Sequence, residues 1–525
     1  MRRPVAWTIA LLLSAQLGRA AQPAAAPAEQ AAITRAADAL RAGDLDTAHV
    51  LLRETVERHP DAADAWYLLG LLYERRDDPA SARAAYERAV ALAPRFAPAH
   101  DRLGFVLGRL GETGAALERF ARAAALDPQF FDAHYHLGAT AWWTKDFERA
   151  RPALEAAVRL QPDHVEARYY LGATLRQLGR PAEAVVHLRH AVAVDPGFAR
   201  GHLQLGLALQ QWGDLDGALA AVRRAVELDP AGFDARNSLG LLLVETGDAT
   251  GAEAAFRALV ADFPDRSTAR LNLGTALMQR GDLDGAVGVF RDLIARDPTN
   301  AEAHYNLGVA LKHQDRFADA EAALRRAVAL DPALAEAHFT LGVVLWQTGR
   351  AEEGAAAFRE AIARQPSYGE AHYMLGTVLK QLGRIEEAIA AVRESLRHRP
   401  EAADAQLTLG QLLQQQGDQA GAAAAFAEAA RLNRRKADWQ ASQFAVSVGV
   451  ERLERGEIKS AVERLQEAVR LAPDNAKAHY QLARALGRLG AHGEARRHFE
   501  TARRLAPYLQ PPDEVARLER VPPRR

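Results

Sequence analysis

The chain has 525 residues, of which 49% are hydrophobic and 25% are charged, and these proportions exclude wholesale disorder and a polytopic membrane protein. Lys and Arg total 66 and Asp and Glu total 67, so the net charge of −1 gives no electrostatic sign of nucleic-acid binding. Cysteine is absent, which excludes disulfides, thiolate metal sites, iron–sulfur clusters and cysteine nucleophiles.

The N-terminus has the order of parts that is typical of an export signal. Two arginines follow the first methionine, residues 5–17 are mainly apolar, and the small residues Gly18 and Ala20 suit a cleavage site. We therefore expect a signal peptide at 1–20, cleaved after Ala20, and a flexible linker at 21–28. The alternative is an uncleaved signal that anchors the protein in the membrane. In both cases the rest of the chain lies outside the cytoplasm.

Most of the sequence consists of an internal repeat with a period of 34 residues. Proline recurs at this interval from Pro60 to Pro400, and the interval returns between Pro473 and Pro507. If this proline is numbered position 32, the repeat is written fourteen times. The repeats start at residues 29, 63, 97, 131, 165, 199, 233, 267, 301, 335, 369, 403, 442 and 476.

Each repeat predicts two helices. Apolar residues at positions 4, 7, 8 and 11 share one face of a first helix, helix A, and positions 20, 24 and 27 share one face of a second, helix B. Position 15 is usually a glycine such as Gly281, which ends helix A in a left-handed conformation. An acid such as Asp282 often follows and caps helix B, which the position-32 proline then ends. Gly at position 8 and Ala at position 20 let the two helices approach closely.

This pattern, Trp-x2-Leu-Gly-x2-Tyr followed by Ala-x3-Phe and a terminal proline, resembles the tetratricopeptide repeat family. Residues 301–308, Ala-Glu-Ala-His-Tyr-Asn-Leu-Gly, lie very near the family consensus, and the match covers about nine-tenths of the chain. The resemblance implies an all-α fold, an α-solenoid in which antiparallel helix pairs stack into a right-handed superhelix. It also implies that helix A lines a concave groove and that helix B forms the convex face.

Two stretches depart from the repeat and set the expected domain boundaries. The first repeat is degenerate, as expected for a terminal repeat whose outer face meets water. Residues 432–441 lose the proline and gain about five residues, which indicates a joint between two arrays. The expected segments are an array of twelve repeats at 29–436, an irregular joint at 437–441, two C-terminal repeats at 442–509, and a capping helix and tail at 510–525.

A basic run, Arg434, Arg435 and Lys436, lies next to the joint. It admits two interpretations, a basic binding loop or a solvated extension of helix B.

The candidates for chemistry are few. Seven of the 17 histidines occupy position 4, the aromatic position of helix A, so a packing role accounts for them. No Ser-His-Asp set, phosphate-binding loop or pair of carboxylates stands out from the repeat. We therefore expect no catalysis, no metal and no cofactor. The seven histidines are His100, His134, His202, His304, His338, His372 and His479.

The resemblance places the groove at helix-A positions 2, 5, 9, 12 and 13. Position 5 is often aromatic, and positions 12 and 13, which packing constrains less, carry aromatics, amides and bases. Rings supply contact area, amides pair with a peptide backbone and bases meet carboxylates, so such a groove can hold an extended peptide. The candidate partner-binding residues are Tyr135, Trp142, Trp143, Tyr169, Arg176, Tyr305, Asn306, Lys312, Phe339, Trp346, Tyr373 and Lys380.

Two candidates carry open questions. Tyr135 and Trp142 are seven residues apart and should share a patch, whereas Trp143 could instead pack on the adjoining repeat near Gln177. Asn306 and Asn272 occupy position 6, where protein-glycosylating members of the family carry an asparagine ladder, but no other repeat matches that ladder.

We expect a non-enzymatic, exported scaffold that binds extended segments of partner proteins and not nucleic acid. Alanine richness and the short signal indicate a bacterial protein of the periplasm or a secreted one. The alternative is an accessory subunit of an envelope enzyme or secretion machine, such as one for polysaccharide synthesis and export or a glycosyltransferase complex. The first hypothesis predicts weak capture of many peptides, and the second predicts one stoichiometric partner.

Overall fold

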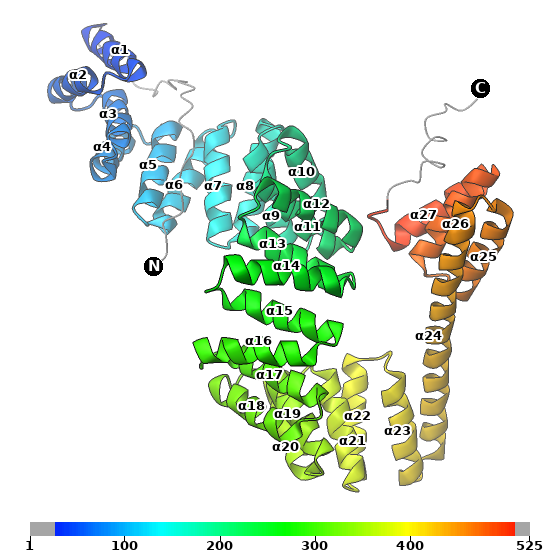
Figure 1. Ribbon diagram of the computed structural model, residues 1–525. Helices are drawn as coiled ribbons and strands as arrows, with labels where there is room; N and C mark the ends of the chain where they lie inside the picture. The colour runs from blue at the N-terminus through cyan, green and yellow to red at the C-terminus, as the bar shows by residue number, and fades with distance from the viewer. Residues whose placement is uncertain (1–26, 510–525) are drawn as a thin grey trace. The chain divides into compact units, whose positions relative to one another are not determined.

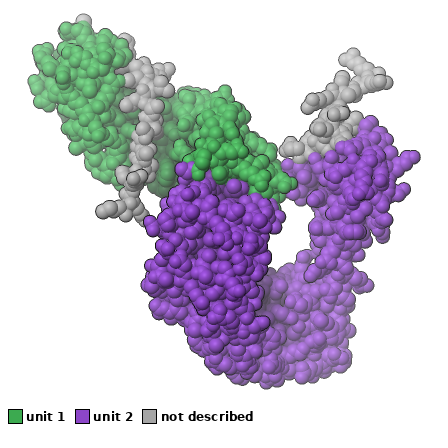
Figure 2. All heavy atoms as spheres, in the orientation of Figure 1, with its two compact units in different colours: residues 1–230 green, residues 231–525 purple. Residues whose placement is uncertain are grey.

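The computed structural model describes residues 27–509 and arranges them as 27 α-helices joined by short turns (Figure 1). Within this span the chain forms no strand, and the α-solenoid fold predicted from the repeat is confirmed. The chain divides into two compact units, residues 1–230 and 231–525 (Figure 2). This division falls inside the array expected at 29–436. The signal peptide expected at 1–20 and the capping helix and tail expected at 510–525 lie outside the described residues.

The first compact unit holds six repeats, in which odd-numbered helices are helix A and even-numbered helices are helix B. Its helices are α1 (Pro27–Ala42), α2 (Leu45–Arg58), α3 (Ala63–Arg75), α4 (Pro79–Leu92), α5 (Ala97–Arg109), α6 (Thr113–Leu126), α7 (Phe131–Trp143), α8 (Phe147–Leu160), α9 (Val165–Gln177), α10 (Pro181–Val194), α11 (Ala199–Trp212) and α12 (Leu215–Leu228). Helix α1 begins at Pro27, within the linker expected at 21–28.

The second compact unit holds the remaining eight repeats. Its helices are α13 (Phe233–Glu245), α14 (Ala249–Asp262), α15 (Ser267–Arg280), α16 (Leu283–Arg296), α17 (Ala301–His313), α18 (Phe317–Leu330), α19 (Ala335–Gln347), α20 (Ala351–Arg364), α21 (Gly369–Gln381), α22 (Ile385–His398), α23 (Ala403–Gln416), α24 (Gln419–Glu454), α25 (Ile458–Leu471), α26 (Ala476–Leu489) and α27 (His492–Leu505).

The turn between helix A and helix B follows the predicted chemistry. Gly281 has a φ of 84°, and the side chain of Asp282 accepts a hydrogen bond from the Gly285 amide at 2.9 Å. Asp77, Lys145 and Asp315 occupy the same position 15 in their repeats and adopt φ values of 57°, 62° and 58°. The backbone of this turn is therefore left-handed whether or not glycine supplies it.

Close approach of the two helices explains the glycine at position 8. A Cβ atom at Gly308 would lie 2.6 Å from Cγ of Leu324 and 3.3 Å from the carbonyl oxygen of Ala320. The side chain that needs the glycine is thus the large one at position 24. Ala320, at position 20, contributes its backbone to the same contact. Packing of a large residue into this space outweighs the cost of about 1 kcal/mol for glycine inside a helix.

The side chain at position 4 makes a hydrogen bond that the sequence analysis did not predict. It reaches back six residues to the carbonyl of the proline that ends the preceding repeat. Trp66 donates from Nε1 to Pro60 at 3.0 Å, and Nε2 of His338 lies 3.2 Å from the oxygen of Pro332. Arg168 and Arg270, also at position 4, donate to Pro162 and Pro264 in the same way, so the position selects a side chain with an N–H donor. The same contact is made by His100, His134, His202, His304, His372 and His479.

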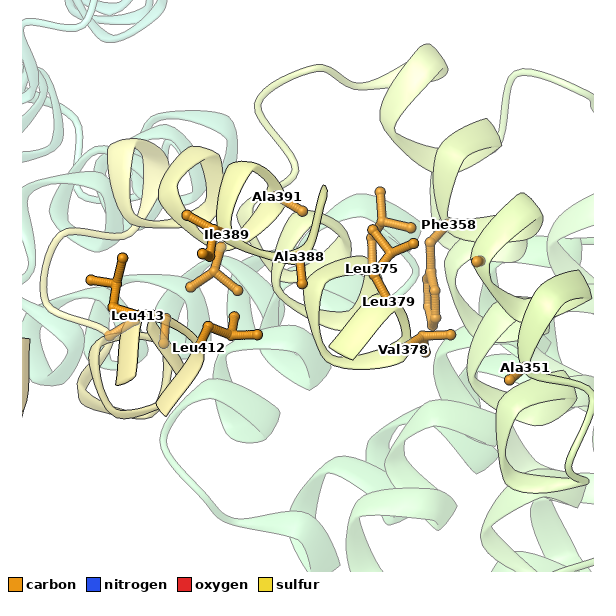
Figure 3. Close-up of a cluster of buried hydrophobic side chains, with 14 of the residues drawn as sticks. Ala351, Phe358, Leu375, Val378, Leu379, Ala388, Ile389, Ala391, Leu412 and Leu413 are labelled. Atoms are coloured by element: carbon orange, nitrogen blue, oxygen red, sulfur yellow. The ribbon is translucent and has the colours of Figure 1, made fainter. Parts of the chain in front are cut away.

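The hydrophobic core runs from one repeat into the next. In the second compact unit, buried side chains of α20, α21, α22 and α23 form one cluster, and Figure 3 shows them directed into a shared interior. Phe358 of α20 and Val378 of α21 are fully buried there. Each repeat thus covers the apolar surface of its neighbour, as a stacked repeat requires.

Repeats 12 and 13 share a single helix. Helix α24 has 36 residues and takes the place of helix B of repeat 12 and helix A of repeat 13 (Figure 1). The basic run at 434–436 is therefore part of an extension of helix B, the second of the two interpretations of that run. The irregular joint expected at 437–441 is therefore wrong, because these residues lie inside the helix. Arg434 stands where the other repeats have proline, and 432–441 contains neither proline nor glycine, so nothing stops the helix. Although α24 is long, no helix within residues 27–509 is apolar enough over its length to cross a membrane.

Candidate functional site

Within each compact unit, we call the surface that carries helix-A positions 2, 5, 6, 9, 12 and 13 the A face. On this surface, position 5 of one repeat meets position 6 of the next, 35 residues along the chain. Asn272 donates from Nδ2 to Oδ1 of Asn237 at 2.7 Å, and the hydroxyls of Tyr373 and Thr408 are 3.4 Å apart. These contacts connect successive helices of the face and keep its side chains in a fixed order.

An aromatic cluster occupies the A face of repeats 4 and 5, on α7 and α9. The rings of Trp142 and Trp143 are 5.0 Å apart, and Trp142 lies 5.4 Å from Tyr170, both edge to face. Tyr170 also lies 6.2 Å from Tyr135, so it connects Tyr135 with Trp142. The sequence analysis did not select Tyr170. Its position 6, one repeat after Tyr135 at position 5, was the signal that could have found it.

The two tyrosines at position 5 are largely buried. Tyr135 and Tyr169 are each 7% exposed, and burial raises the pKa of both phenols. Tyr135 stacks on Phe131 at 5.8 Å, and Tyr169 meets Phe198 edge to face at 5.3 Å. These two rings support the cluster from below and leave little of their surface to a ligand.

The two indoles of the cluster differ in what they leave open. Trp143 is 49% exposed. Trp142 is half-buried, and its Nε1 atom is buried without a hydrogen-bond partner among the described residues. An indole N–H can only donate, and leaving a buried donor unpaired costs about 1–3 kcal/mol.

Bases occupy position 12, at the end of helix A. Arg176 donates from Nε to Gln204 at 3.2 Å, and Nζ of Lys380 donates to Gln411 at 2.5 Å, both in the next repeat. Lys312 is half-buried and makes no hydrogen bond or ion pair within residues 27–509, and burial lowers the pKa of its amine. The amine of Lys312 is therefore partly desolvated and unpaired, and it is available to a ligand carboxylate.

Acids occupy position 2 of the same helices, at the opposite end. Glu166, Glu302 and Glu370 lie in the first turns of α9, α17 and α21. Ten residues of helix separate positions 2 and 12, about 15 Å at 1.5 Å per residue. In repeats 5, 9 and 11 the A face therefore has an acid at one edge and a base at the other.

The remaining candidates lie in the second compact unit. Phe339 packs 5.6 Å from Phe358 and 5.0 Å from Tyr368, and the Trp346 indole donates to Gln381 at 2.7 Å. Tyr305, Asn306 and Tyr373 are half-buried. The twelve candidates thus do not form one site. They are distributed along the A faces of the two units. Among them, Trp142 and Trp143 are in close contact with each other.

A polar network that the sequence analysis missed connects repeats 2 to 4. Asp101 is 1% exposed and its Oδ1 lies 2.8 Å from Nδ1 of His136. Tyr86 donates its hydroxyl to Glu74, whose pKa is raised by burial, and the guanidinium of Arg102 lies near both carboxylates. Position 5 of repeat 3 and position 6 of repeat 4 supply the Asp101–His136 pair, so the same rule of neighbouring positions would have found it.

Within the described residues, no three histidine, aspartate or glutamate side chains come together as a metal site. Stacked helix pairs that carry a continuous face of aromatic, amide and charged side chains define the class of α-solenoid interaction scaffolds. The chain belongs to the tetratricopeptide repeat family. Its sequence matches that repeat at residues 33–95, 109–171, 144–199, 203–267, 237–301, 271–335, 305–369, 345–397, 373–441 and 449–490.

Several solved structures are similar to this chain, whereas no curated protein matches its sequence. A crystal structure of MamA is 28% identical, with 31% of this chain and 96% of MamA covered and a TM-score of 0.30. YrrB, described as a repeat protein with an unusual peptide-binding site, is 23% identical, with 35% and 95% covered and a TM-score of 0.34. A tetratricopeptide repeat protein from Parabacteroides merdae is 18% identical, with 47% and 98% covered and a TM-score of 0.42.

Proposed function

We propose that the protein is a non-enzymatic scaffold that holds extended segments of partner proteins along its A face, outside the cytoplasm. The family supports a scaffold for protein–protein interaction. The aromatic cluster of Trp142, Trp143 and Tyr170 carries the more specific part of the proposal.

Two properties of this site favour a peptide as the ligand. Its outer ring, Trp143, is half exposed, which gives a partner side chain an apolar surface to cover. Arg176, the base at position 12 one repeat further on, suits a carboxylate of the same segment.

The test is substitution of Trp142 by alanine. Binding of peptides selected from a library of unstructured sequences on the wild-type protein should weaken by roughly 1–4 kcal/mol, as at an interface hot spot. The unfolding midpoint should move little, because Trp142 is half-buried on the surface of the array. Titration calorimetry and thermal melts measure the two effects.

Phe444 of α24, an exposed aromatic outside the A face, provides the control. Phe444→Ala should leave binding of the same peptides unchanged. Unchanged binding in Trp142→Ala, or collapse of the fold when Trp142 and Trp143 are both replaced by alanine, would show that these rings are structural.

The scaffold role and the alternative role as an accessory subunit are distinguished by the stoichiometry of capture. A scaffold for extended segments captures many peptides weakly, whereas an accessory subunit of an envelope enzyme or export machine binds one partner in a fixed ratio. Affinity capture from an envelope extract, followed by mass spectrometry, separates these outcomes.

A further inference from the structure

The middle of α24 is an exposed stretch of helix that the repeat pattern does not require. Every residue from 433 to 441 is exposed, although the helix is packed against α23 before this stretch and against α25 after it. In the other repeats a short turn closes this place, and the next helix A starts directly against its neighbour. The extra residues of α24 hold repeat 13 away from repeat 12 and leave a gap on one side of the helix.

This gap is a cleft of about 980 Å³, which we call the joint cleft. One wall is the turn before α23, the base is α24, and the other wall is the turn between α25 and α26. Part of the lining is apolar, and we call this part the floor; it includes the exposed indole of Trp439. The floor residues are Leu432, Trp439, Leu471, Ala472 and Pro473.

Positive charge is concentrated on the base of the cleft. Arg431, Arg434, Arg435 and Lys436 line it within two turns of α24, together with one acid, Asp438. Arg431 pairs with Glu428 on its own helix at 2.6 Å. Arg434 and Lys436 form no ion pair with any residue between 27 and 509, so two cations are available to a ligand.

Arg435 connects the two walls of the cleft. Its guanidinium lies 2.7 Å from Glu401 on one wall and 3.5 Å from Asp474 on the other. All three side chains are more than half exposed, and exposed ion pairs of this kind contribute at most about 1 kcal/mol. A ligand carboxylate can therefore replace Glu401 or Asp474 as the partner of Arg435 at little cost in free energy. It can then accept two hydrogen bonds from the guanidinium.

We propose that the joint cleft is a second docking site, which binds an acidic segment of a partner protein with one large apolar side chain. The carboxylates of the segment pair with Arg434, Arg435 and Lys436, and its apolar side chain covers Trp439 and the floor. Three acids also line the cleft, Glu401 and Asp474 on the walls and Asp438 on the base, and they oppose a ligand with a negative charge on every residue. A peptide with two or three acids therefore fits better than nucleic acid. This site is independent of the A face and does not rest on the function proposed for it.

Fluorescence anisotropy with the full-length protein and defined probes tests the proposal. The probes are a labelled twelve-residue peptide with three acids around a central leucine, the same peptide with alanine for leucine, and its charge-reversed form. The acidic leucine peptide should bind tightest, the alanine form several-fold more weakly, and the charge-reversed form not at all.

Variants of α24 locate the binding. Changing Arg434 and Lys436 together to glutamate should weaken binding of the acidic peptide at least about ten-fold, and Trp439→Ala should weaken it about five-fold or more. Because these side chains are exposed, the variants keep the fold, which circular dichroism verifies.

Matched controls use exposed residues of the same region outside the cleft. Phe444→Ala removes an aromatic that is 73% exposed on α24. Arg455→Glu with Lys459→Glu reverses two exposed charges, one in the turn after α24 and one in the first turn of α25. Both should leave binding within two-fold of the wild type. Trp142→Ala should also leave it unchanged, so failure of this site and failure of the A-face proposal can be told apart.

Three results would overturn the proposal. They are equal weakening by the control charge reversal, no binding of the acidic peptide by the wild type, and tighter binding of single-stranded DNA than of the peptide with no dependence on Trp439. The last result would assign the basic run to nucleic acid instead.

Discussion

Position 15 of the repeat shows how the same backbone conformation is reached by residues with very different costs. Glycine adopts a positive φ without strain, whereas a residue with a Cβ atom pays for the contact between that atom and the carbonyl that follows. Lys145 has a φ of 62° and is exposed, and it makes no ion pair among the described residues that could repay this cost.

We expect Lys145→Gly to stabilise the protein by about 1 kcal/mol, because the strain of the left-handed conformation is larger than the extra chain entropy of glycine in the unfolded state. Gly281→Lys, at the same position of repeat 8, should destabilise it by a similar amount. Urea denaturation followed by circular dichroism measures both. A lower midpoint for Lys145→Gly would mean that this lysine has a structural role.

Position 4 shows a residue chosen for a donor as well as for bulk. His100 is 3% exposed, its Nε2 lies 3.0 Å from the oxygen of Pro94, and its Nδ1 has no partner among the described residues. Burial lowers the pKa of His100, and the nearby Arg119 and Arg122 act in the same direction. A second proton would thus be placed on a buried nitrogen that has no acceptor.

The pH dependence follows from this direction. The unfolded chain binds the proton with the ordinary pKa of 6.5, and the folded chain binds it less readily. The stability contributed by neutral His100 is therefore present above pH 6.5 and is lost as the pH falls through the lower, folded-state value. Burial also lowers the pKa of His479, which makes the same contact with Pro473 in repeat 14.

The test compares His100→Gln and His100→Ala in thermal melts between pH 5 and 8. His100→Gln introduces the residue that repeat 12 carries at this position, Gln406, and should reduce the loss of stability in acid. His100→Ala should cost about 1–3 kcal/mol at pH 7.5, because it leaves the carbonyl of Pro94 unpaired. An acid sensitivity that is unchanged in both variants would exclude His100 as its source.

At the scale of the element, the helix pair could be predicted almost completely from the sequence. Gly281, Asp282 and the position-32 proline each have one mechanical role in a turn, and their recurrence fixed both ends of each helix. The bond from position 4 to the proline carbonyl could not be predicted in this way, because a histidine that packs and a histidine that donates leave the same pattern.

The contacts between neighbouring helices were also beyond the sequence analysis, although for another reason. Tyr170 and the pair of Asp101 with His136 become neighbours only when adjacent repeats are superimposed at an offset of 35 residues. The joint was ambiguous for a third reason, since a lost proline and five added residues suit a loop as well as a helix. The segment forms a helix and not a loop because 432–441 contains no helix-breaking residue.

Damage to one helix pair should remain local. Gly308→Leu places side-chain atoms where Leu324 and the carbonyl of Ala320 already lie, and overpacking of this kind costs on the order of 1–3 kcal/mol. Because each repeat contacts mainly its neighbours, hydrogen exchange should rise at 267–368 and stay nearly unchanged at 63–130. Gly288→Leu is the control, since a Cβ atom there meets nothing within 4 Å. Uniform loss of protection along the chain would contradict the nearest-neighbour arrangement.

At the scale of the whole molecule, the open question is where the scaffold works. If the signal peptide expected at 1–20 is cleaved, the mature protein begins at Ala21. Removal of Arg2, Arg3 and Arg19 without any acid would change the net charge from −1 to −4.

N-terminal sequencing of the protein from a periplasmic extract tests this prediction. We expect the first residue to be Ala21. An intact Met1 in the membrane pellet would instead support an uncleaved anchor, and an intact Met1 in the cytosol would contradict export.

The shared helix of repeats 12 and 13 has a geometric consequence of its own. Two helix pairs joined by a turn can adjust their mutual angle at that turn, but two pairs built on one helix keep an azimuth set by the number of residues between them. Each residue added to the exposed middle of α24 would rotate the last two repeats by about 100° around the helix axis and move them about 1.5 Å along it. Seven added residues would bring them back to within about 20° of their present direction, about 10 Å further away. The length of this segment thus determines the direction in which the C-terminal repeats face.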